Sequence, residues 1–169
     1  FSGVSPSTTG CYLNGPEWKK FIKPGQGLNA HFKKSGYYVM GTGKTYHSKN
    51  YEDEWDEYPA LQKPSTGGAS KYEGYFEPLP IKMKDEDLGD WHSVNYCIEK
   101  LGKEWDQPFF LACGLIKPHL PWAVPKKYFD LFPRDQIKLP PITKGDFSDI
   151  PEIAHKIGSH ADHSRFLES

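Results

Sequence analysis

Apolar and polar positions follow one another along the chain in blocks that predict helices and strands in turn. Leu28 and Phe32 lie four residues apart in a stretch that ends at Gly36, which predicts a short helix closing at that glycine. The next stretch, YYVMGTG at residues 37–43, predicts a buried strand running into a glycine turn. Residues 108–116, PFFLACGLI, are almost all apolar after the proline, which predicts a central strand covered on both faces.

A longer helix is predicted between these two strands. In residues 85–105, acidic side chains precede apolar residues at the spacing of one helical face: Leu88, Trp91, Val94, Ile98 and Leu101. Residues 48–84 are polar, aromatic and rich in proline, so a long surface loop is expected there. Pro125 is expected to open a further helix through Tyr128, Leu131 and Phe132. Alternating strands and helices predict an α/β fold.

Composition narrows the class of protein. A chain of 169 residues suits one domain, and 21 Lys and Arg against 22 Asp and Glu leave a net charge of −1. This balance does not predict binding to nucleic acid or to an anionic membrane, and no apolar run is long enough to span a bilayer. The three cysteines predict neither a zinc site nor a disulfide framework, although one disulfide remains possible. Because the chain begins at Phe1 without methionine, we expect a fragment of a longer protein.

A lysine and a histidine follow each of the two predicted strands. Lys44 and His47 follow the first strand, and Lys117 and His119 follow the second. Strand ends of α/β sheets are common ligand sites, and two ammonium groups with two imidazoles suit a compact oxyanion such as sulfate or phosphate. The segment GTGK does not complete a nucleotide-binding P-loop, because Tyr38 stands where that motif needs its first glycine.

Each of these residues also has a plainer interpretation. A lysine at a strand exit is often only solvated, and Trp122, which could line a sugar pocket, could equally pack in its proline-rich turn. Metal binding by His47 and His119 is a further option, without a supporting carboxylate motif. The remaining histidines fit packing or surface roles, or, for the last three, a loose metal cluster or solvated helix face: His31, His92, His155, His160 and His163.

Longer stretches of the sequence resemble a known family. HFKKSGYYVMGTGKTYH, followed later by PFFLACGLIKPHLPWAVPKKYFDLFP, resembles the type I sulfatases, and most closely their iduronate-2-sulfatase-like branch. That branch carries G-K-x-x-H after a strand and K-P-H-x-P after P-F-F-L-A-x-G, in the same order as here. FSG and SPSTTGCYLNG, at residues 1–3 and 5–15, resemble the end of the sulfatase signature and the segment that follows it.

The resemblance implies a fold, a reaction and roles for particular residues. The fold is the α/β alkaline-phosphatase-like sulfatase fold, a mixed sheet flanked by helices, of which residues 1–169 would be the central part of a single catalytic domain. The reaction is hydrolysis of a sulfate ester by a hydrated formylglycine, with a calcium ion holding sulfate oxygens. Lys44 would bind the sulfate and His47 would take the proton that expels sulfate from the covalent intermediate. His119 would protonate or hydrogen-bond the leaving alcohol, and Lys117 would add positive charge beside it.

The resemblance also sets limits. The formylglycine is expected upstream of Phe1 and the calcium ligands outside this chain, so this polypeptide alone is not expected to turn over. Expected partners are a sulfated carbohydrate or other sulfate ester and a formylglycine-generating or sulfatase-maturing enzyme, and the expected location is secreted, periplasmic or lysosomal. Two other functions stay open: a phosphodiesterase or phosphonate hydrolase of the same superfamily, and a non-catalytic module that binds sulfated glycans.

Overall fold

The computed structural model describes residues 1–13, 18–47, 51–59, 79–119, 122–141, 143–145 and 148–158. The chain forms two compact units, Phe1–Leu131 and Phe132–Ser169. The expectation of a single sulfatase domain stays a prediction. The first unit contains these elements: α1 (Pro6–Thr9), η1 (Trp18–Phe21), α2 (Leu28–Lys34), β1 (Tyr38–Gly43), η2 (Glu52–Glu54), β2 (Leu79–Ile81), η4 (Asp85–Asp87), α3 (Gly89–Leu101), β3 (Phe109–Gly114), β4 (Ala123–Pro125) and α4 (Lys126–Asp130). The second contains η5 (Arg134–Gln136) and α5 (Glu152–Gly158).

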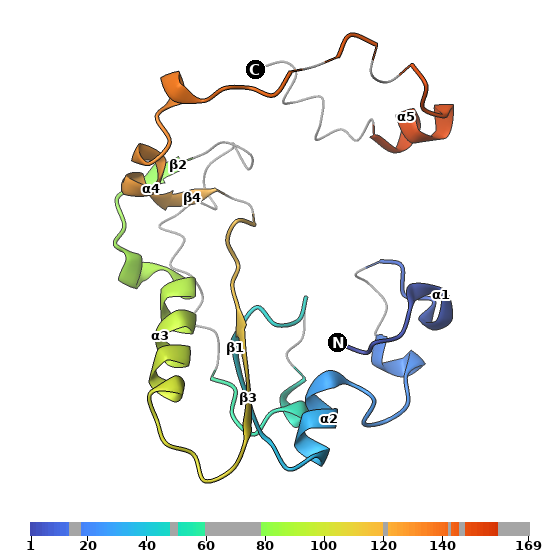
Figure 1. The fold of residues 1–169 in the computed structure, drawn as a ribbon, viewed down its shortest axis with the longest axis vertical. Helices are drawn as coiled ribbons and strands as arrows, with labels where there is room; N and C mark the ends of the chain where they lie inside the picture. Colours follow the sequence, from blue (N-terminus) through green and yellow to red (C-terminus); the bar gives the residue numbers. More distant parts are fainter. Residues whose placement is uncertain are drawn as a thin grey trace. The chain divides into compact units, whose positions relative to one another are not determined.

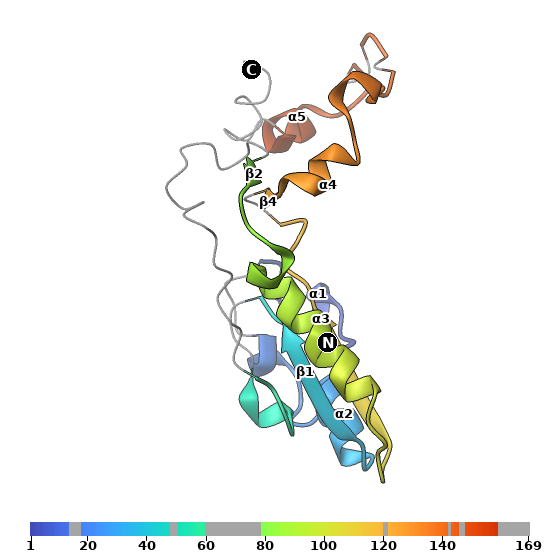
Figure 2. The same ribbon diagram turned by 90° about the vertical axis from the view of Figure 1, so that its left-hand side faces the viewer.

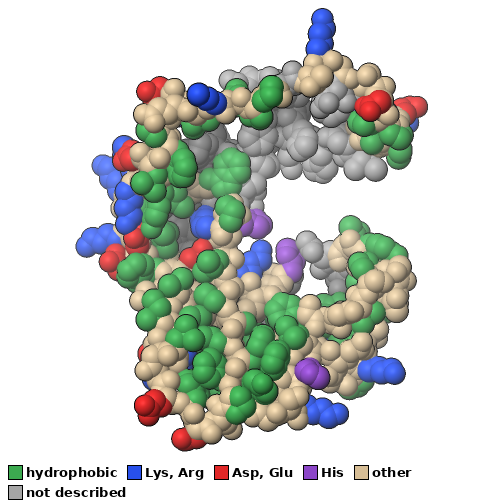
Figure 3. Space-filling model, in the orientation of Figure 1, with side chains coloured by type: hydrophobic (Ala, Val, Ile, Leu, Met, Phe, Trp, Pro, Cys, Tyr) green, Lys and Arg blue, Asp and Glu red, His purple; other side chains and the backbone are tan. Residues whose placement is uncertain are grey.

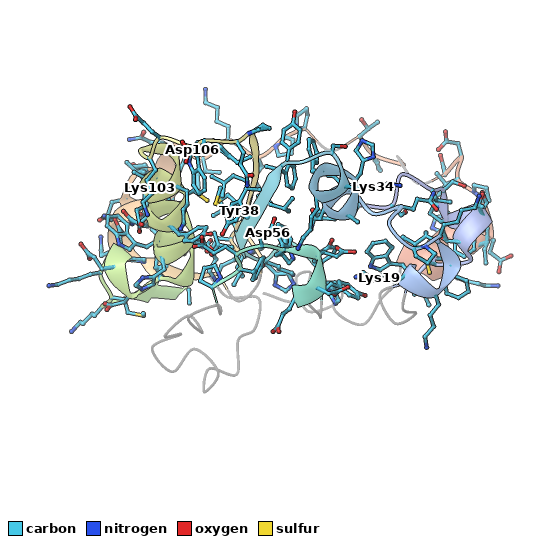
Figure 4. The ribbon with its side chains drawn as sticks, turned by 90° about the horizontal axis from the view of Figure 1, so that it is seen from below. Lys19, Lys34, Tyr38, Asp56, Lys103 and Asp106 are labelled. Carbon is cyan, nitrogen blue, oxygen red and sulfur yellow. The ribbon has the colours of Figure 1, made fainter. Side chains whose placement is uncertain are left out.

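The centre of the first unit is the parallel pair of strands β1 and β3, paired from Tyr38 with Phe109 to Gly43 with Gly114. Viewed along the strands, α3 lies on one side of the pair and α2 on the other (Figure 1, Figure 4). A second pair, β2 with β4, is also parallel. The antiparallel strands that a mixed sheet requires do not occur among the described residues.

The predicted helix near residue 28 and the strand after it are confirmed. Helix α2 ends at Lys34, and Gly36 follows with a φ of +81°, a left-handed conformation that glycine adopts without strain. The N–H of Tyr37 then donates to the carbonyl of Phe32 at 3.1 Å, which closes the last turn. Strand β1 begins at Tyr38 and is buried from Val39 onward, as its apolar sequence predicts.

The predicted surface loop over residues 48–84 holds only in part for the residues that the structure describes. Trp55 is only 5% exposed, and a Cβ on Gly41 would lie 2.4 Å from its ring. Glu57 forms a bridge with Met40, so the segment lies along the edge of β1 that faces away from β3. Residues 48–50 and 60–78 lie outside the described residues. Residues 79–81 form a strand, β2, where a loop was expected.

Helix α3 forms where the sequence predicts, but its apolar stripe does not face the sheet. The residues that it buries are Gly89, Ser93, Cys97 and Lys100. Members of the stripe remain exposed, Ile98 at 60% and Leu101 at 64%. Figure 2 shows the helix running alongside β1. The periodicity predicted the helix correctly, but in this chain small and polar side chains form the packed face.

Two further predictions need correction. Strand β3 is only half-buried over most of its length, so it is not covered on both faces here, and among the described residues it pairs with β1 alone. The helix after Pro125 ends at Asp130, before two of the apolar residues assigned to it, Leu131 and Phe132. The three cysteines all carry free thiols. Within the described residues, no helix has the length and apolarity needed to cross a bilayer.

Candidate active site

The carboxyl ends of β1 and β3 bring the two lysine- and histidine-bearing segments to one edge of the sheet. Gly43 and Gly114 end the two strands as register partners. The N–H of Lys44 donates to the carbonyl of Gly114 at 2.9 Å, so the ladder continues one residue beyond the strand. Lys and His side chains gather beyond these strand ends (Figure 3). The predicted convergence of the two segments on one sheet edge therefore agrees with the backbone.

Both strand ends require glycine. Gly43 has a φ of +76°, and a Cβ at this position would lie 1.8 Å from the carbonyl oxygen of Gly114. A Cβ on Gly114 would in turn lie 2.2 Å from the carbonyl carbon of Lys44. Atoms cannot approach this closely, so only a glycine pair allows the backbone of Lys44 to cross the end of β3. Steric constraints at the strand end thus explain Gly43 of the GTGK sequence, which resembles a phosphate-binding loop.

The turn after β1 is held from outside by Tyr58. Its hydroxyl donates to the carbonyl of Gly43 at 2.5 Å and lies 3.0 Å from Oγ1 of Thr45. Tyr58 comes from the segment that lies along the outer edge of β1. That segment therefore supports the turn that carries Lys44 and His47.

A buried hydrogen-bond network holds the same turn from inside. Tyr46 is 9% exposed; its hydroxyl donates to Oε2 of Glu54 at 2.5 Å and accepts from Nδ2 of Asn29 at 3.2 Å. Nζ of Lys19 lies 2.8 Å from Oε1 of the same glutamate. Burial, with the nearby Glu54 carboxylate, raises the pKa of Tyr46 well above its ordinary value, so the phenol stays protonated and remains a donor.

Tyr46 is buried, but the two candidate site residues near it in the sequence are more exposed. Lys44 is half-buried and His47 is exposed. These two side chains are therefore accessible at the sheet edge while the residue between them anchors the turn. A fixed backbone of this kind limits the positions that a lysine ammonium can reach, which favours binding of a defined anion.

The segment after β3 is a tight turn that begins with Lys117. The peptide bond between Lys117 and Pro118 is cis, and the N–H of His119 donates to the carbonyl of Ile116 at 2.9 Å. Nζ of Lys117 lies 3.4 Å from the carbonyl oxygen of His119. Burial lowers the pKa of Lys117, while the negative charge of Asp90 acts in the opposite direction. The side chain of His119 is exposed.

Trp122 closes this turn. Its indole N–H donates to the carbonyl of Pro118 at 2.9 Å, and the residue is 38% exposed. This hydrogen bond ties the indole to the turn, and the side chain stays exposed. A role in contacting a sugar ring stays a prediction.

Five further histidines are candidates from the sequence. His31, His92 and His155 are exposed, and His160 and His163 lie outside the described residues. No group of three or more His, Cys, Asp or Glu side chains in the described part of the chain is placed to hold a metal ion. A cavity of about 500 Å³ lies elsewhere, lined by residues between 19 and 34 together with Asp53 and Glu54. None of the predicted site residues lines it.

The residues that support the site carry no local signal of that role in the sequence. Tyr46, Tyr58 and Glu54 act through buried or partly buried contacts with other segments of the chain, and nothing in their local pattern indicates this. Asp90 has a visible signal, an acid at the start of a helix, but that signal points to helix stabilisation only. Its contact with residues 116 and 117, across 26 and 27 positions of sequence, depends on the fold.

A parallel strand pair flanked by helices, with cationic residues following the carboxyl ends of its strands, defines an α/β protein with a candidate oxyanion site. No family model matches the chain. The chain is 32% identical to a sulfatase from Formosa agariphila over 92% of its length, and 29% and 30% identical to the iduronate 2-sulfatases of Mus musculus and Homo sapiens over 89% and 83%. The chain is thus related to the sulfatase family over most of its length, and its fold class is the alkaline-phosphatase-like α/β fold of these relatives.

The chain covers only part of the length of each of these relatives. It spans 35%, 33% and 29% of their lengths, so about a third of each. The resemblance to sulfatases that the longer stretches of the sequence indicated is confirmed at the level of the family.

Proposed function

We propose that the chain is part of a sulfuric ester hydrolase. The two segments that follow β1 and β3, one with Lys44 and His47 and the other with Lys117 and His119, bind and act on the sulfate group of a sulfated sugar or another sulfate ester. One observation carries the proposal. Lys44 continues the ladder between β1 and β3 by donating to Gly114, so both lysine- and histidine-bearing segments leave the same sheet edge, in a chain related to sulfatases.

Lys44 is proposed to bind the sulfate oxygens. A sulfate group is weakly basic, so protonation stabilises it little, and cations aimed at its oxygens must stabilise the charge that develops during reaction. Lys44 is half-buried, and its backbone is fixed by Gly114. A lysine whose backbone is fixed and whose side chain is half-buried loses less freedom on binding than a fully solvated lysine.

His47 is proposed to take a proton from the hydrated nucleophile in the step that releases sulfate. Formylglycine, when hydrated, would supply the attacking hydroxyl, and we place it upstream of Phe1. Two contacts support this placement: the ring of Phe1 lies 4.4 Å from that of Tyr46, and the carbonyl of Phe1 accepts from the N–H of Leu28 at 2.9 Å. The chain before Phe1 would thus continue from a place next to the turn that carries His47.

His119 and Lys117 are proposed to act on the leaving group. As the bond between sulfur and the ester oxygen breaks, the leaving oxygen takes a proton from the imidazole of His119, which avoids release of a costly alkoxide. Lys117 adds positive charge beside that oxygen. Burial lowers the pKa of Lys117, and an anion bound beside its ammonium group would counteract this effect and favour the charged form.

The described residues do not fit a calcium ion. Calcium needs six to eight oxygen ligands, and the described part of the chain offers no cluster of three candidate side chains. We therefore derive no step through a metal from this chain. The proposed calcium ligands, like the nucleophile, belong to other parts of the parent protein.

The proposal includes a biological setting. A formylglycine-generating or sulfatase-maturing enzyme would act on the parent protein, and the protein would be secreted, periplasmic or lysosomal. These points are supported only by the relationship to sulfatases.

The test uses the full-length parent protein, expressed with a sulfatase-maturing enzyme and calcium. We expect hydrolysis of an aryl sulfate to exceed that of a matched aryl phosphodiester, and Lys44→Ala to lower kcat/KM for the sulfate by about 100-fold or more. Lys34→Ala, an exposed lysine on α2 (Figure 4), is the matched control and should retain wild-type activity. Preference for the phosphodiester would instead support the related phosphodiesterase function. Binding of sulfated glycans without turnover would support a non-catalytic module.

A further inference from the structure

The carboxylate of Asp90 holds the backbone that leads from β3 into the Lys117 turn. Asp90 lies in the first turn of α3 and is half-buried. Its Oδ1 accepts from the N–H of Ile116 at 2.8 Å, and its Oδ2 accepts from the N–H of Lys117 at 2.9 Å. A single carboxylate thus binds two consecutive backbone amides, which fixes both the position and the orientation of the chain at this point.

A series of hydrogen bonds continues from this contact to His119. Ile116, held through its N–H by Asp90, accepts through its carbonyl from the N–H of His119 at 2.9 Å. Pro118 in turn accepts from the indole of Trp122 at 2.9 Å. The backbone between residues 116 and 119 is therefore fixed at its start by α3 and at its end by its own turn.

The charge of Asp90 also acts on the first lysine of the turn. Burial lowers the pKa of Lys117, and the Asp90 carboxylate counteracts this effect. The aspartate therefore favours a charged Lys117 in a partly buried position. Asp90 also lies in the first turn of α3, where the helix dipole interacts favourably with negative charge.

We propose that Asp90 is a positioning residue of the candidate site, which sets the place of Lys117 and His119 from α3 without touching the substrate. The catalytic part of this inference rests on the proposed sulfatase function. Its structural part, that Asp90 fixes the amides of residues 116 and 117, does not depend on that function.

The experiment compares Asp90→Ala, Asp90→Asn and Asp87→Ala in the full-length parent protein. Asp87 is the matched control, because its carboxylate also accepts a backbone N–H, that of Lys84 at 3.0 Å, within its own short turn. Hydrogen exchange read by mass spectrometry on peptides covering residues 114–119 measures the amides directly. We expect about 10- to 100-fold faster exchange in Asp90→Ala, less in Asp90→Asn, and none of this increase in Asp87→Ala.

Kinetics on a sulfate ester then test the effect on the reaction. We expect Asp90→Ala to lower kcat by about 10-fold or more, with a smaller change in KM, because His119 would act mainly during bond breaking. Asp90→Asn keeps one acceptor oxygen and should recover part of the rate. The melting temperature and the exchange of α3 amides report whether each variant is folded.

The outcomes separate this inference from the proposed function. Unchanged exchange over residues 114–119 in a folded Asp90→Ala variant would refute the structural part, whatever the activity. Faster exchange with wild-type kcat would refute the positioning role and leave the proposed function intact. A wild-type protein without sulfate-ester turnover would refute the proposed function and the catalytic part together, while the exchange data would still decide whether Asp90 holds this segment.

Discussion

The backbone N–H of Lys44 donates to the carbonyl of Gly114 at 2.9 Å. The bond lies next to the last register pair of β1 and β3, Gly43 with Gly114. These two glycines are 71 positions apart in the sequence. Because Lys44 and Lys117 follow these strand ends within three residues, the strand ladder itself determines how the two segments lie beside each other.

Replacing Gly43 by alanine should destabilise the protein strongly. The new Cβ would lie 1.8 Å from the Gly114 carbonyl oxygen, and the φ of +76° adds strain. Relief requires the strand ends to separate, so we expect a loss of more than about 3 kcal/mol in the free energy of unfolding. Denaturant unfolding of the full-length parent measures it.

Gly10→Ala is the control for this change. Gly10 has a similar φ of +69°, but a Cβ at this position would meet nothing within 4 Å. Only the backbone strain remains, and we expect about 1–2 kcal/mol. Equal losses in the two variants would contradict the close approach of Gly43 to Gly114.

Tyr46→Phe should destabilise the turn between Lys44 and His47. The change removes the donor to Glu54 and the acceptor for Asn29 in a buried network, which costs about 1–3 kcal/mol. Thermal or denaturant unfolding measures the loss. Tyr12→Phe, at a residue 70% exposed, should change stability by no more than about 0.5 kcal/mol. A neutral Tyr46→Phe variant would contradict the anchoring role.

Asp56 makes a pH-dependent contribution to stability. Its burial acts to raise its pKa, but hydrogen bonds from the Val39 N–H at 2.8 Å and from Lys33, at 2.9 Å, outweigh burial and lower the pKa below its ordinary value of 3.8. An aspartate with a lowered folded pKa stabilises the protein fully above its unfolded pKa, and this contribution is lost as pH falls through the folded pKa. Figure 4 shows the side chain beside the strand pair.

The measurement compares wild type with Asp56→Asn by urea unfolding from pH 7 to pH 2. We expect the stability difference to stay constant down to about pH 4 and to shrink below it. A difference that already shrinks between pH 7 and pH 5 would show a raised pKa and would contradict this arrangement.

The sequence predicted those parts of the fold that depend on local patterns. Helix α2 and strand β1 follow from apolar spacing and from glycine at their ends, and α3 follows from its acids and its helical period. The role of Trp55 was missed because it packs on Gly41 of β1, a long-range contact without local signal. The packed face of α3 was hidden for the same reason: Ser93 and Cys97 are small enough to lie against the strands.

The candidate site was predicted in part. The lysine and histidine after each strand were visible as motifs because each pair is closely spaced. Their convergence could be expected because parallel strands end at the same edge of a sheet. The residues that fix the two turns, Tyr46, Tyr58 and Asp90, were not, since each acts across many positions of sequence. The sequence thus indicated which groups could react, and the structure adds what holds their backbone.

The most direct test of the proposed chemistry is the leaving-group dependence of a His119→Ala variant in the full-length parent, with His92→Ala, at an exposed position on α3, as control. If His119 protonates the departing oxygen, kcat/KM should fall by about 100-fold or more for an alkyl or sugar sulfate, and far less for 4-nitrophenyl sulfate, whose phenolate leaves without a proton. The control should match wild type on both. An equal loss on the two substrates, or no loss on the alkyl sulfate, would contradict the account.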